Sequence, residues 1–410
     1  MAQREAPRSA APPDPRPGAV IVVFNLPVPD DHRVWAQACT LRDAGLAVTV
    51  VCPAIRGAAP GQRRIDGVDV HCFRSFEGGG RAATVLEGAW TTLAAARAAQ
   101  RALARLRGPR ALQVCNPPDL SFRLLRWARR RGARTVYDQH DVVPLLAAAR
   151  PAFRRLAGFF EACERRTVAA ADVVLTPSDE QARRLRALYG RDAVVVRTAA
   201  VAEASADSRA GNGTDSAGTD EPTVLGYLGV IGEQDGVVDL IDAAHALRAR
   251  GRTDFRIEIA GDGPALPSVR ARVAELGLGD VVQLHGWVGR EEIDAFLKGI
   301  DAMVVPDPES EFNHHCAMNK VTHAMARGIP VVLRPLRENA RLAGRDGYLA
   351  ADLSPAAFAE AIERLLDAPP TERAQVGARL RAAFEADLSW DTHGPRYLAA
   401  IRGDQAEQGD

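Results

Sequence analysis

The chain has 410 residues, enough for two large domains or three of about 150 residues each. Its 52 basic residues (Lys and Arg) equal its 52 acidic residues, so it lacks the basic excess of proteins that coat nucleic acid. Hydrophobic residues make up 47%, enough for a large core, and the apolar runs fall short of the ~18 residues that span a bilayer.

The N-terminal segment and the cysteines indicate the compartment. Residues 1–18 are rich in Pro, Ala and Arg and lack the apolar centre of a secretory signal, so we interpret them as a disordered leader. The six cysteines include no C-x-x-C pair, and several lie in apolar strand-like runs, as free thiols do in a reducing environment. We therefore expect a cytoplasmic protein.

Short β-branched runs alternate with longer helical stretches in the first half of the chain. Strands are predicted at 19–24, 47–52, 68–73, 111–115, 135–138, 173–176 and 193–197, and helices at 31–44, 82–107, 120–131, 153–170 and 180–189. This order favours a parallel sheet with helices on both faces. It predicts a first domain over residues 19–201.

Residues 202–222 are dominated by small and polar side chains without apolar periodicity, as in a flexible linker. A second alternating series follows, with strands at 223–228, 255–260, 281–284, 302–305 and 330–333 and helices at 237–250, 265–275, 290–298, 318–327 and 355–366. It predicts a second domain over 223–400, a C-terminal helix around 395–401 that returns to the first domain, and a tail over 401–410. The expected fold class is α/β, with two doubly wound parallel sheets facing a cleft, and ligands at the carboxyl ends of the strands.

The end of the first predicted strand carries a candidate anion site. An aspartate at position 30 or 31 can cap the following helix, whose free N–H groups would attract a phosphate. Arg33 could reach a phosphate bound there. The alternative is a capped helix with a solvated arginine.

The strand at 135–138 ends in a second polar group that contains Asp138, His140 and Asp141. An imidazole beside carboxylates can position a sugar or transfer protons. The alternative is a histidine whose hydrogen bonds are satisfied by loop backbone.

Two glycine-rich turns follow strands of the second predicted domain. Gly229 and Gly232 lie in the first turn, and Gly261, Asp262 and Gly263 form the second. Glycine lets a backbone approach a diphosphate closely. Because glycine-rich loops are common, each could also be an ordinary turn.

Residues 306–330 form a long loop followed by a helix, and they hold the densest group of candidate side chains. Lys320 lies in the first turn of that helix, where the helix dipole disfavours a cation unless an anion is near. A zinc site is conceivable here, although its spacing matches no common ligand pattern. Its ligands would be His314, His315, Cys316 and His323.

Taken together, these motifs resemble the GT-B glycosyltransferases, in particular the retaining bacterial sugar transferases of family four. The resemblance extends over residues 19–400. The segments that carry it are Asp31-His32-Arg33-Val34 with 41–50, 116–120, 137–141, 227–229 with 234–236, 261–264, and 318–320 with 325–332.

The resemblance implies that the second domain holds a nucleotide diphosphate sugar and the first domain an acceptor, which could be a small molecule, a glycan or a lipid-linked sugar. His140 would face the donor sugar and phosphate, and Lys320 would stabilise the departing diphosphate; these are the expected catalytic residues. The other donor-binding residues would be Arg33, Gly229, Gly232, Gly261, Asp262, Gly263, His315, Met318, Asn319 and His323. Asn116, Asp138 and Asp141 would lie on the acceptor side. Transfer would retain the anomeric configuration without a metal, a cofactor or a nucleophilic side chain.

Four positions depart from the family pattern. Two glutamates eight residues apart, one for the sugar and one for the ribose, correspond here to His315 and His323. A neutral imidazole accepts one hydroxyl hydrogen bond where a carboxylate accepts two. An arginine and a lysine in the first loop of the second domain correspond to Val230 and Asp235, which leaves Lys320 and Arg33 as phosphate cations.

Three functions fit these features: an active retaining transferase, a non-catalytic GT-B homologue that acts as a binding or partner subunit, and a GT-B epimerase or phosphorylase. The third is least favoured because no acid/base pair or cofactor lysine stands out. Residues 150–166 mix arginines with Leu156, Phe159 and Phe160. They could form a peripheral membrane contact or an ordinary helix with a solvated arginine face.

Overall fold

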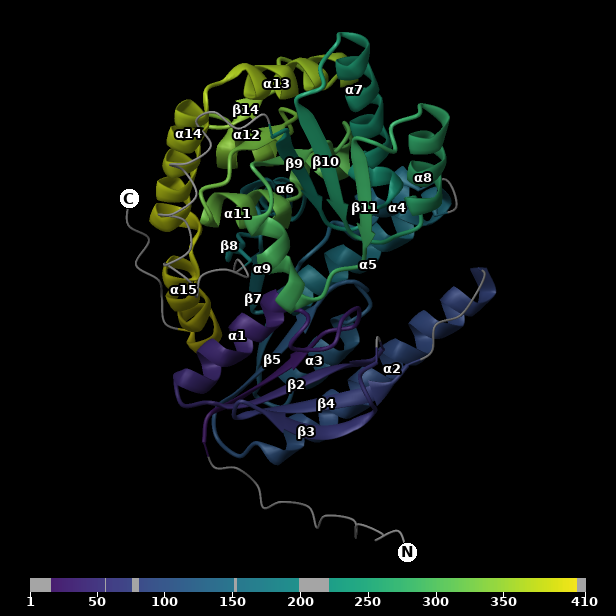
Figure 1. Ribbon diagram of the computed structural model, residues 1–410. Helices are drawn as coiled ribbons and strands as arrows, with labels where there is room; N and C mark the ends of the chain where they lie inside the picture. Colours follow the sequence, from purple (N-terminus) through teal and green to yellow (C-terminus); the bar gives the residue numbers. More distant parts are fainter. Residues whose placement is uncertain (1–15, 56, 76–80, 151–152, 199–220, 404–410) are drawn as a thin grey trace, which may run out of the picture. The chain divides into compact units, whose positions relative to one another are not determined.

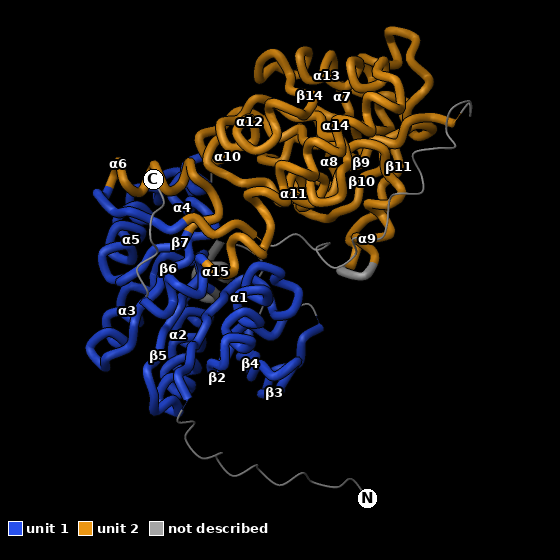
Figure 2. Tube along the Cα trace, turned by 90° about the vertical axis from the view of Figure 1, so that its left-hand side faces the viewer, with its two compact units in different colours: residues 1–175, 189–194, 396–410 blue, residues 176–188, 195–395 orange. Residues whose placement is uncertain are grey.

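The structure is a computed structural model that describes residues 16–55, 57–75, 81–150, 153–198 and 221–403. Most of the predicted leader, linker and tail lies outside these residues. The chain forms two compact units, coloured separately in Figure 2. Unit 1 comprises 1–175, 189–194 and 396–410, and unit 2 comprises 176–188 and 195–395.

Unit 1 is built on an eight-stranded sheet of order β3-β4-β2-β1-β5-β6-β7-β8. The strands are β1 Gly18–Val22, β2 Ala47–Ala54, β3 Gly61–Ile65, β4 Val68–Arg74, β5 Arg110–Cys115, β6 Arg134–Asp138, β7 Val173–Thr176 and β8 Val194–Val195. The pairings from β4 to β7 are parallel, and β3 is antiparallel to β4. The sequence did not predict β3, because four of its five residues are exposed and no apolar alternation marks it.

The helices of unit 1 connect these strands (Figure 1). They are α1 His32–Asp43, α2 Arg81–Arg105, α3 Phe122–Arg129, α4 Val143–Ala149 and α5 Ala157–Ala170. Local chemistry sets the limits of α1: the Asp31 carboxylate accepts from the N–H of Val34 at 3.0 Å, and Gly45, with φ of 85°, follows its end. Val34, Ala38 and Leu41 form its buried face.

Unit 2 is built on a six-stranded parallel sheet of order β11-β10-β9-β12-β13-β14. The strands are β9 Thr223–Leu228, β10 Phe255–Ala260, β11 Val282–Gly286, β12 Ala302–Val305, β13 Val331–Leu333 and β14 Tyr348–Leu349. The helices are α6 Asp179–Tyr189, α7 Val237–Ala249, α8 Leu266–Glu275, α9 Arg290–Lys298, α10 Glu311–His315, α11 Asn319–Ala326, α12 Arg337–Ala343, α13 Pro355–Asp367, α14 Pro370–Ala383 and α15 Trp390–Arg402. One apolar cluster packs α7, α8 and α13 on one face, and a second packs α9, α11 and α14 on the other. The predicted fold class, two doubly wound parallel α/β domains, is confirmed.

The strand order fixes where each sheet can bind a ligand. In unit 1 the order reverses at β1, which lies between β2 and β5; in unit 2 it reverses at β9, which lies between β10 and β12. Loops that leave neighbouring strands at such a point diverge to opposite faces and open a crevice. The loops that follow β1, β5, β9 and β12 are therefore the candidates for function.

One chain segment joins a different unit from the one the sequence predicted. The strand end at Thr176 and nearly all of α6 were assigned to the first domain but pack in unit 2, because ion pairs connect α6 to α12. The C-terminal helix expected around 395–401 is α15, which starts in unit 2 and contributes its residues from Arg396 onward to unit 1. There Tyr397 Oη donates to Gln113 Oε1 at 2.7 Å, and Arg134 Nε donates to the carbonyl of Ala400 at 3.0 Å.

The described helices include none with the length and apolarity that a membrane span requires.

Candidate active site

At the carboxyl end of β6, the buried carboxylate of Asp138 collects four side chains. The guanidinium of Arg33 binds both oxygens, with Nη2 2.6 Å from Oδ1 and Nε 3.1 Å from Oδ2. Gln37 and Gln113 donate to Oδ2 at 2.7 and 3.2 Å. His140 Nε2 lies 3.2 Å from the same oxygen. These residues come from α1, β5 and the loop after β6, so the carboxyl end of this sheet does bring predicted site residues together.

Electrostatics give His140 a definite charge state. Burial alone would lower the pKa of His140, but Asp138 and the nearby Cys115 raise it well above its usual value. Burial would likewise raise the pKa of Asp138, but Arg33 and His140 bring it far below its usual range. At neutral pH the group therefore holds an imidazolium, a guanidinium and one carboxylate. A protonated His140 can donate a hydrogen bond and attract an anion, but it cannot act as a base.

Asn116 holds the loop that carries His140. Its Oδ1 accepts from the N–H groups of His140 and Asp141 at 2.6 and 3.1 Å, and its Nδ2 donates to the carbonyl of Asp141 at 2.6 Å. Asn116 and Asp138 are both buried. Of the three residues expected on the acceptor side, these two therefore support His140, and Asp141 is partly exposed.

A buried acid network behind this loop was not predicted. Asp119 accepts from Tyr137 Oη and from Asn116, while its Oδ2 has no hydrogen-bond partner among the described residues. Gln139 connects onward to the buried Glu164 at 2.7 Å. Burial raises the pKa of Asp119 to about 7. Sequence could not find this group, because its members approach only when β5, β6 and α5 pack together.

In unit 2, Lys320 extends from the first turn of α11 toward two carboxylates. Its Nζ lies 2.9 Å from both oxygens of Asp307 and 3.9 Å from Asp235, and 4.8 Å from the ring centre of Tyr227. Burial would lower the pKa of Lys320, but Asp307, Tyr227 and Asp235 raise it above its usual value. The anion that a lysine at a helix N-terminus requires is thus supplied by the chain itself.

The glycine turns of unit 2 pack directly on each other. The N–H of Gly229 donates to the carbonyl of Ala260 at 3.0 Å, and that of Ile231 to Asp262 at 3.0 Å, so the loops extend the β9–β10 ladder. A Cβ on Gly261 would lie 1.8 Å from the carbonyl oxygen of Gly229, and one on Gly263 2.5 Å from that of Ile231. Loop-to-loop packing therefore requires Gly261 and Gly263 to be glycine.

The same packing leaves Gly229 beside Lys320, since a Cβ on it would lie 3.9 Å from Lys320 Cε. The N–H of Gly232 donates to Asp235 at 3.0 Å, and Asp262 is exposed. The loop after β9 thus meets the start of α11, as expected for residues that share one site.

The loop between β12 and α11 contains a short helix that the sequence did not predict, α10. Ser310 caps it by accepting from the N–H of Asn313 at 3.0 Å, and Asn313 Nδ2 donates to the carbonyl of Gln234 at 2.8 Å. His315 Nδ1 lies 2.6 Å from the carbonyl of Glu311, so Nδ1 carries the hydrogen. Met318 is the N-cap of α11, Asn319 is exposed in its first turn, and His323 is buried.

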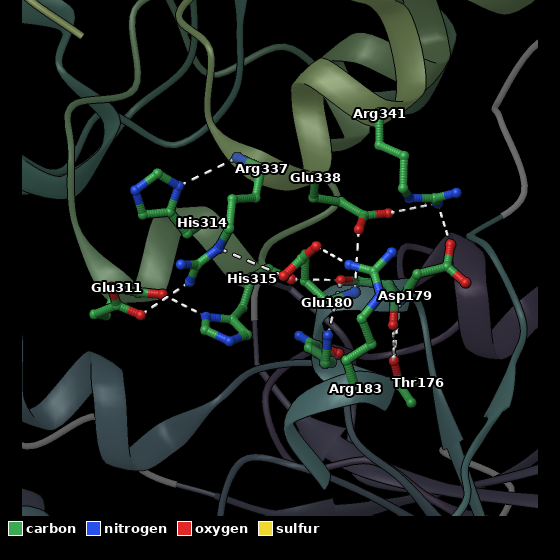
Figure 3. Close-up of polar contacts among 12 residues, drawn as sticks. Thr176, Asp179, Glu180, Arg183, Glu311, His314, His315, Arg337, Glu338 and Arg341 are labelled. Carbon is green, nitrogen blue, oxygen red and sulfur yellow. Dashed lines mark hydrogen bonds and ion pairs between the residues drawn. The ribbon is translucent and has the colours of Figure 1, made fainter. Parts of the chain in front are cut away.

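Ion pairs attach α6 to α10 and α12, as Figure 3 shows. The buried Arg197 binds Glu338 and Asp179, and Arg341 of α12 binds the same two carboxylates. Arg337 joins Glu180 at 3.4 Å and Glu311 at 2.9 Å. In addition, Ser178 Oγ donates to the carbonyl of His315 at 2.6 Å. The start of α6 therefore fixes the position of α10 and its histidines.

Within the described residues, the cluster that could offer three metal ligands is Cys115, Asp138 and His140. Asp138 is already bound by Arg33, whose charge opposes a cation, so this donor set does not suit a metal. The zinc ligands considered from the sequence (His314, His315, Cys316 and His323) do not gather into such a cluster in the part of the chain that the structure describes.

Comparison with known families identifies the chain. A family model described as "Glycosyl transferases group 1" matches residues 222–368, and one described as "Glycosyl transferase 4-like domain" matches residues 31–201. The chain belongs to the group 1 glycosyltransferases of the GT-B fold. The two matches fall on the two sheets, so membership extends to both halves of this glycosyltransferase.

Individual relatives agree with this membership. The chain is 31% identical over 164 residues to 2-deoxystreptamine glucosyltransferase of Streptomyces kanamyceticus, covering 40% of each chain. It is 29% identical over 250 residues to alpha-D-kanosaminyltransferase of the same organism, covering 60% of this chain and 55% of that one. The matches thus span about half the length of these relatives.

Among solved structures, sucrose-phosphate synthase of Thermosynechococcus elongatus superposes with a TM-score of 0.76 at 18% identity, over 95% of this chain and 98% of that one. At that identity the likeness concerns the fold.

Proposed function

We propose that this protein transfers a hexosyl group from a nucleoside diphosphate sugar to an acceptor hydroxyl, with retention of configuration. The observation that carries the proposal is the contact of His140 Nε2 with the buried carboxylate of Asp138 at 3.2 Å. An imidazolium that is 14% exposed, held by Asp138 and flanked by Arg33, is suited to stabilise negative charge that develops on a departing diphosphate.

In the proposed reaction the bond between the anomeric carbon and the diphosphate oxygen breaks, and the acceptor oxygen bonds to the same face of that carbon. The acceptor proton passes to an oxygen of the departing diphosphate. His140 donates a hydrogen bond to that oxygen. Because no step uses a protein base, the raised pKa of His140 is compatible with this chemistry.

Turnover of UDP-, GDP- and TDP-hexoses tests the proposal, with NMR of the product to read its anomeric configuration. His140→Asn is expected to lower kcat about 10²–10³-fold, as the loss of one transition-state donor does. His245→Asn, on the exposed side of α7, is the matched control and should turn over like the native protein. Nucleotide binding without turnover would instead assign the chain as a non-catalytic homologue, and inverted product would exclude the retaining reaction.

A further inference from the structure

A cavity of about 290 Å³ lies in unit 1, and its lining comes from β4, from α2 and from Pro60 and includes no residue assigned above. Figure 1 shows β4 and α2. The cavity lining includes His71 and Arg74 of β4 and Trp90, Arg97 and Arg101 of α2. The volume is at the lower end of the range for small-molecule sites. It is suitable for a ligand the size of a monosaccharide derivative.

The helix side of the cavity follows from residue spacing on α2. Trp90, Ala94, Arg97, Ala98 and Arg101 recur at three- and four-residue intervals, so they share one face. The two alanines leave space between the indole and the guanidiniums. Trp90 Nε1 donates to the carbonyl of Arg74 at 2.9 Å, which fixes the ring while 48% of the side chain stays exposed.

The charged side chains of this face are all arginines. The sequence from Gly88 to Pro118 contains five arginines and no acidic residue. Arginines four residues apart on a helix repel one another by a few tenths of a kcal/mol. Among the described residues, no carboxylate forms an ion pair with Arg74, Arg97 or Arg101. Burial, then Arg105 and Arg101, lower the pKa of His71, which agrees with a positive potential.

We propose that this cavity binds a phosphorylated sugar or polyol, with its phosphate on Arg97 and Arg101 and its apolar face on Trp90. A guanidinium group can donate to two phosphate oxygens at once, and a fixed, half-exposed indole offers a flat apolar surface. The proposal concerns binding alone and does not depend on the transfer reaction.

Calorimetry on the full chain tests the proposal, with glucose 6-phosphate, glucose and inorganic phosphate as probes at low and high salt. Glucose 6-phosphate should bind, and its affinity should fall at high salt, whereas glucose should not bind. The double variant Arg97→Gln/Arg101→Gln should bind glucose 6-phosphate at least tenfold more weakly. Trp90→Ala should weaken the binding of glucose 6-phosphate but leave the affinity for inorganic phosphate unchanged.

The variant Arg123→Gln/Arg130→Gln, with one change on α3 and one at its C-cap, removes the same charge from exposed positions outside the cavity. It should bind glucose 6-phosphate like the native protein. Equal affinity in the native protein and the α2 double variant would overturn the proposal, as would absence of glucose 6-phosphate binding. The proposal would also be overturned if the protein sedimented with phosphatidylglycerol vesicles and glucose 6-phosphate did not release it. The arginines would then bind a lipid surface. These experiments measure binding and not sugar transfer, so a failed transferase assay would not affect the conclusion about this cavity.

Discussion

At the scale of single residues, Arg33 and Lys320 each form an ion pair with a carboxylate that lies outside their own sequence motif. His140 depends on Asp138 for its proton, and Asp138 is held in turn by Arg33 from α1. Lys320 depends on Asp307, which is 13 residues earlier across a loop. The sequence predicted the chemical groups from their places at strand ends. It could not predict the partners, because these contacts form only after distant segments fold together.

The buried Asp119 makes stability depend on pH. Its pKa is about 7 in the folded chain and near 3.8 when unfolded, so between these values only the folded state retains the proton. The free energy of unfolding should therefore fall as pH rises from 3.8 to 7, by on the order of 4 kcal/mol, and then level off. Asp119→Asn should flatten that profile, whereas Asp69→Asn, an exposed carboxylate, should keep it. Urea titrations across this pH range measure both; an unchanged slope in Asp119→Asn would contradict the assignment.

Two variants separate a donor-binding role of Lys320 from a structural one. If Lys320 reaches the diphosphate, Lys320→Ala should weaken UDP or GDP binding by about 1.5–3 kcal/mol, the scale of a hydrogen bond to a charged group. Asp307→Asn leaves the ammonium in place with less opposing charge, so it should bind nucleotide at least as tightly. Calorimetry on the folded variants decides. Unchanged nucleotide affinity in Lys320→Ala would show that the lysine serves only its pair with Asp307.

At the scale of elements, apolar periodicity found most of the buried elements, although α4 and α14, which also bury apolar residues, were not predicted. The central strands β1, β9 and β12 are buried runs and were found, whereas the exposed strand β3 was not. The short helices α10 and α12 were missed because capping and ion pairs, more than apolar repeats, hold them. The glycine turns were found, but their need for glycine comes from the packing of one loop on another.

That packing predicts a specific cost at Gly261. A Cβ there would collide with the carbonyl of Gly229, so Gly261→Ala should lower the free energy of unfolding by more than 3 kcal/mol and loosen the loop after β9. Gly277 is the matched control, because its φ is 63° with nothing within 4 Å of a Cβ. Gly277→Ala should cost only about 1 kcal/mol, from the backbone conformation. Equal losses in denaturant titrations of the two variants would refute the contact.

At the scale of the whole molecule, α15 ties the end of the chain into unit 1. Tyr397 Oη donates to Gln113 Oε1, and the amide of Gln113 donates to Gln37 and Asp138. Tyr397→Phe should therefore cost about 1–3 kcal/mol, because a buried acceptor loses its donor. Tyr348→Phe is the control: no described residue bonds the Tyr348 hydroxyl, so its removal should be nearly neutral. Thermal unfolding of the two variants compares them, and equal midpoints would mean that the Tyr397 bond contributes nothing.

Because unit 1 is completed by residues from the end of the chain, the order of synthesis affects its folding. Gln113 and Tyr397 are separated by 284 positions, and at the usual elongation rate of about 5–20 residues per second the second is made roughly 15 seconds to a minute after the first. Until Tyr397 is made, the nascent unit 1 lacks the hydroxyl donor that completes the network around Asp138. Unit 2 is synthesised in the meantime. A chain released before Tyr397 is made would lack this bond, so its first unit should be less stable than the same unit in the full chain.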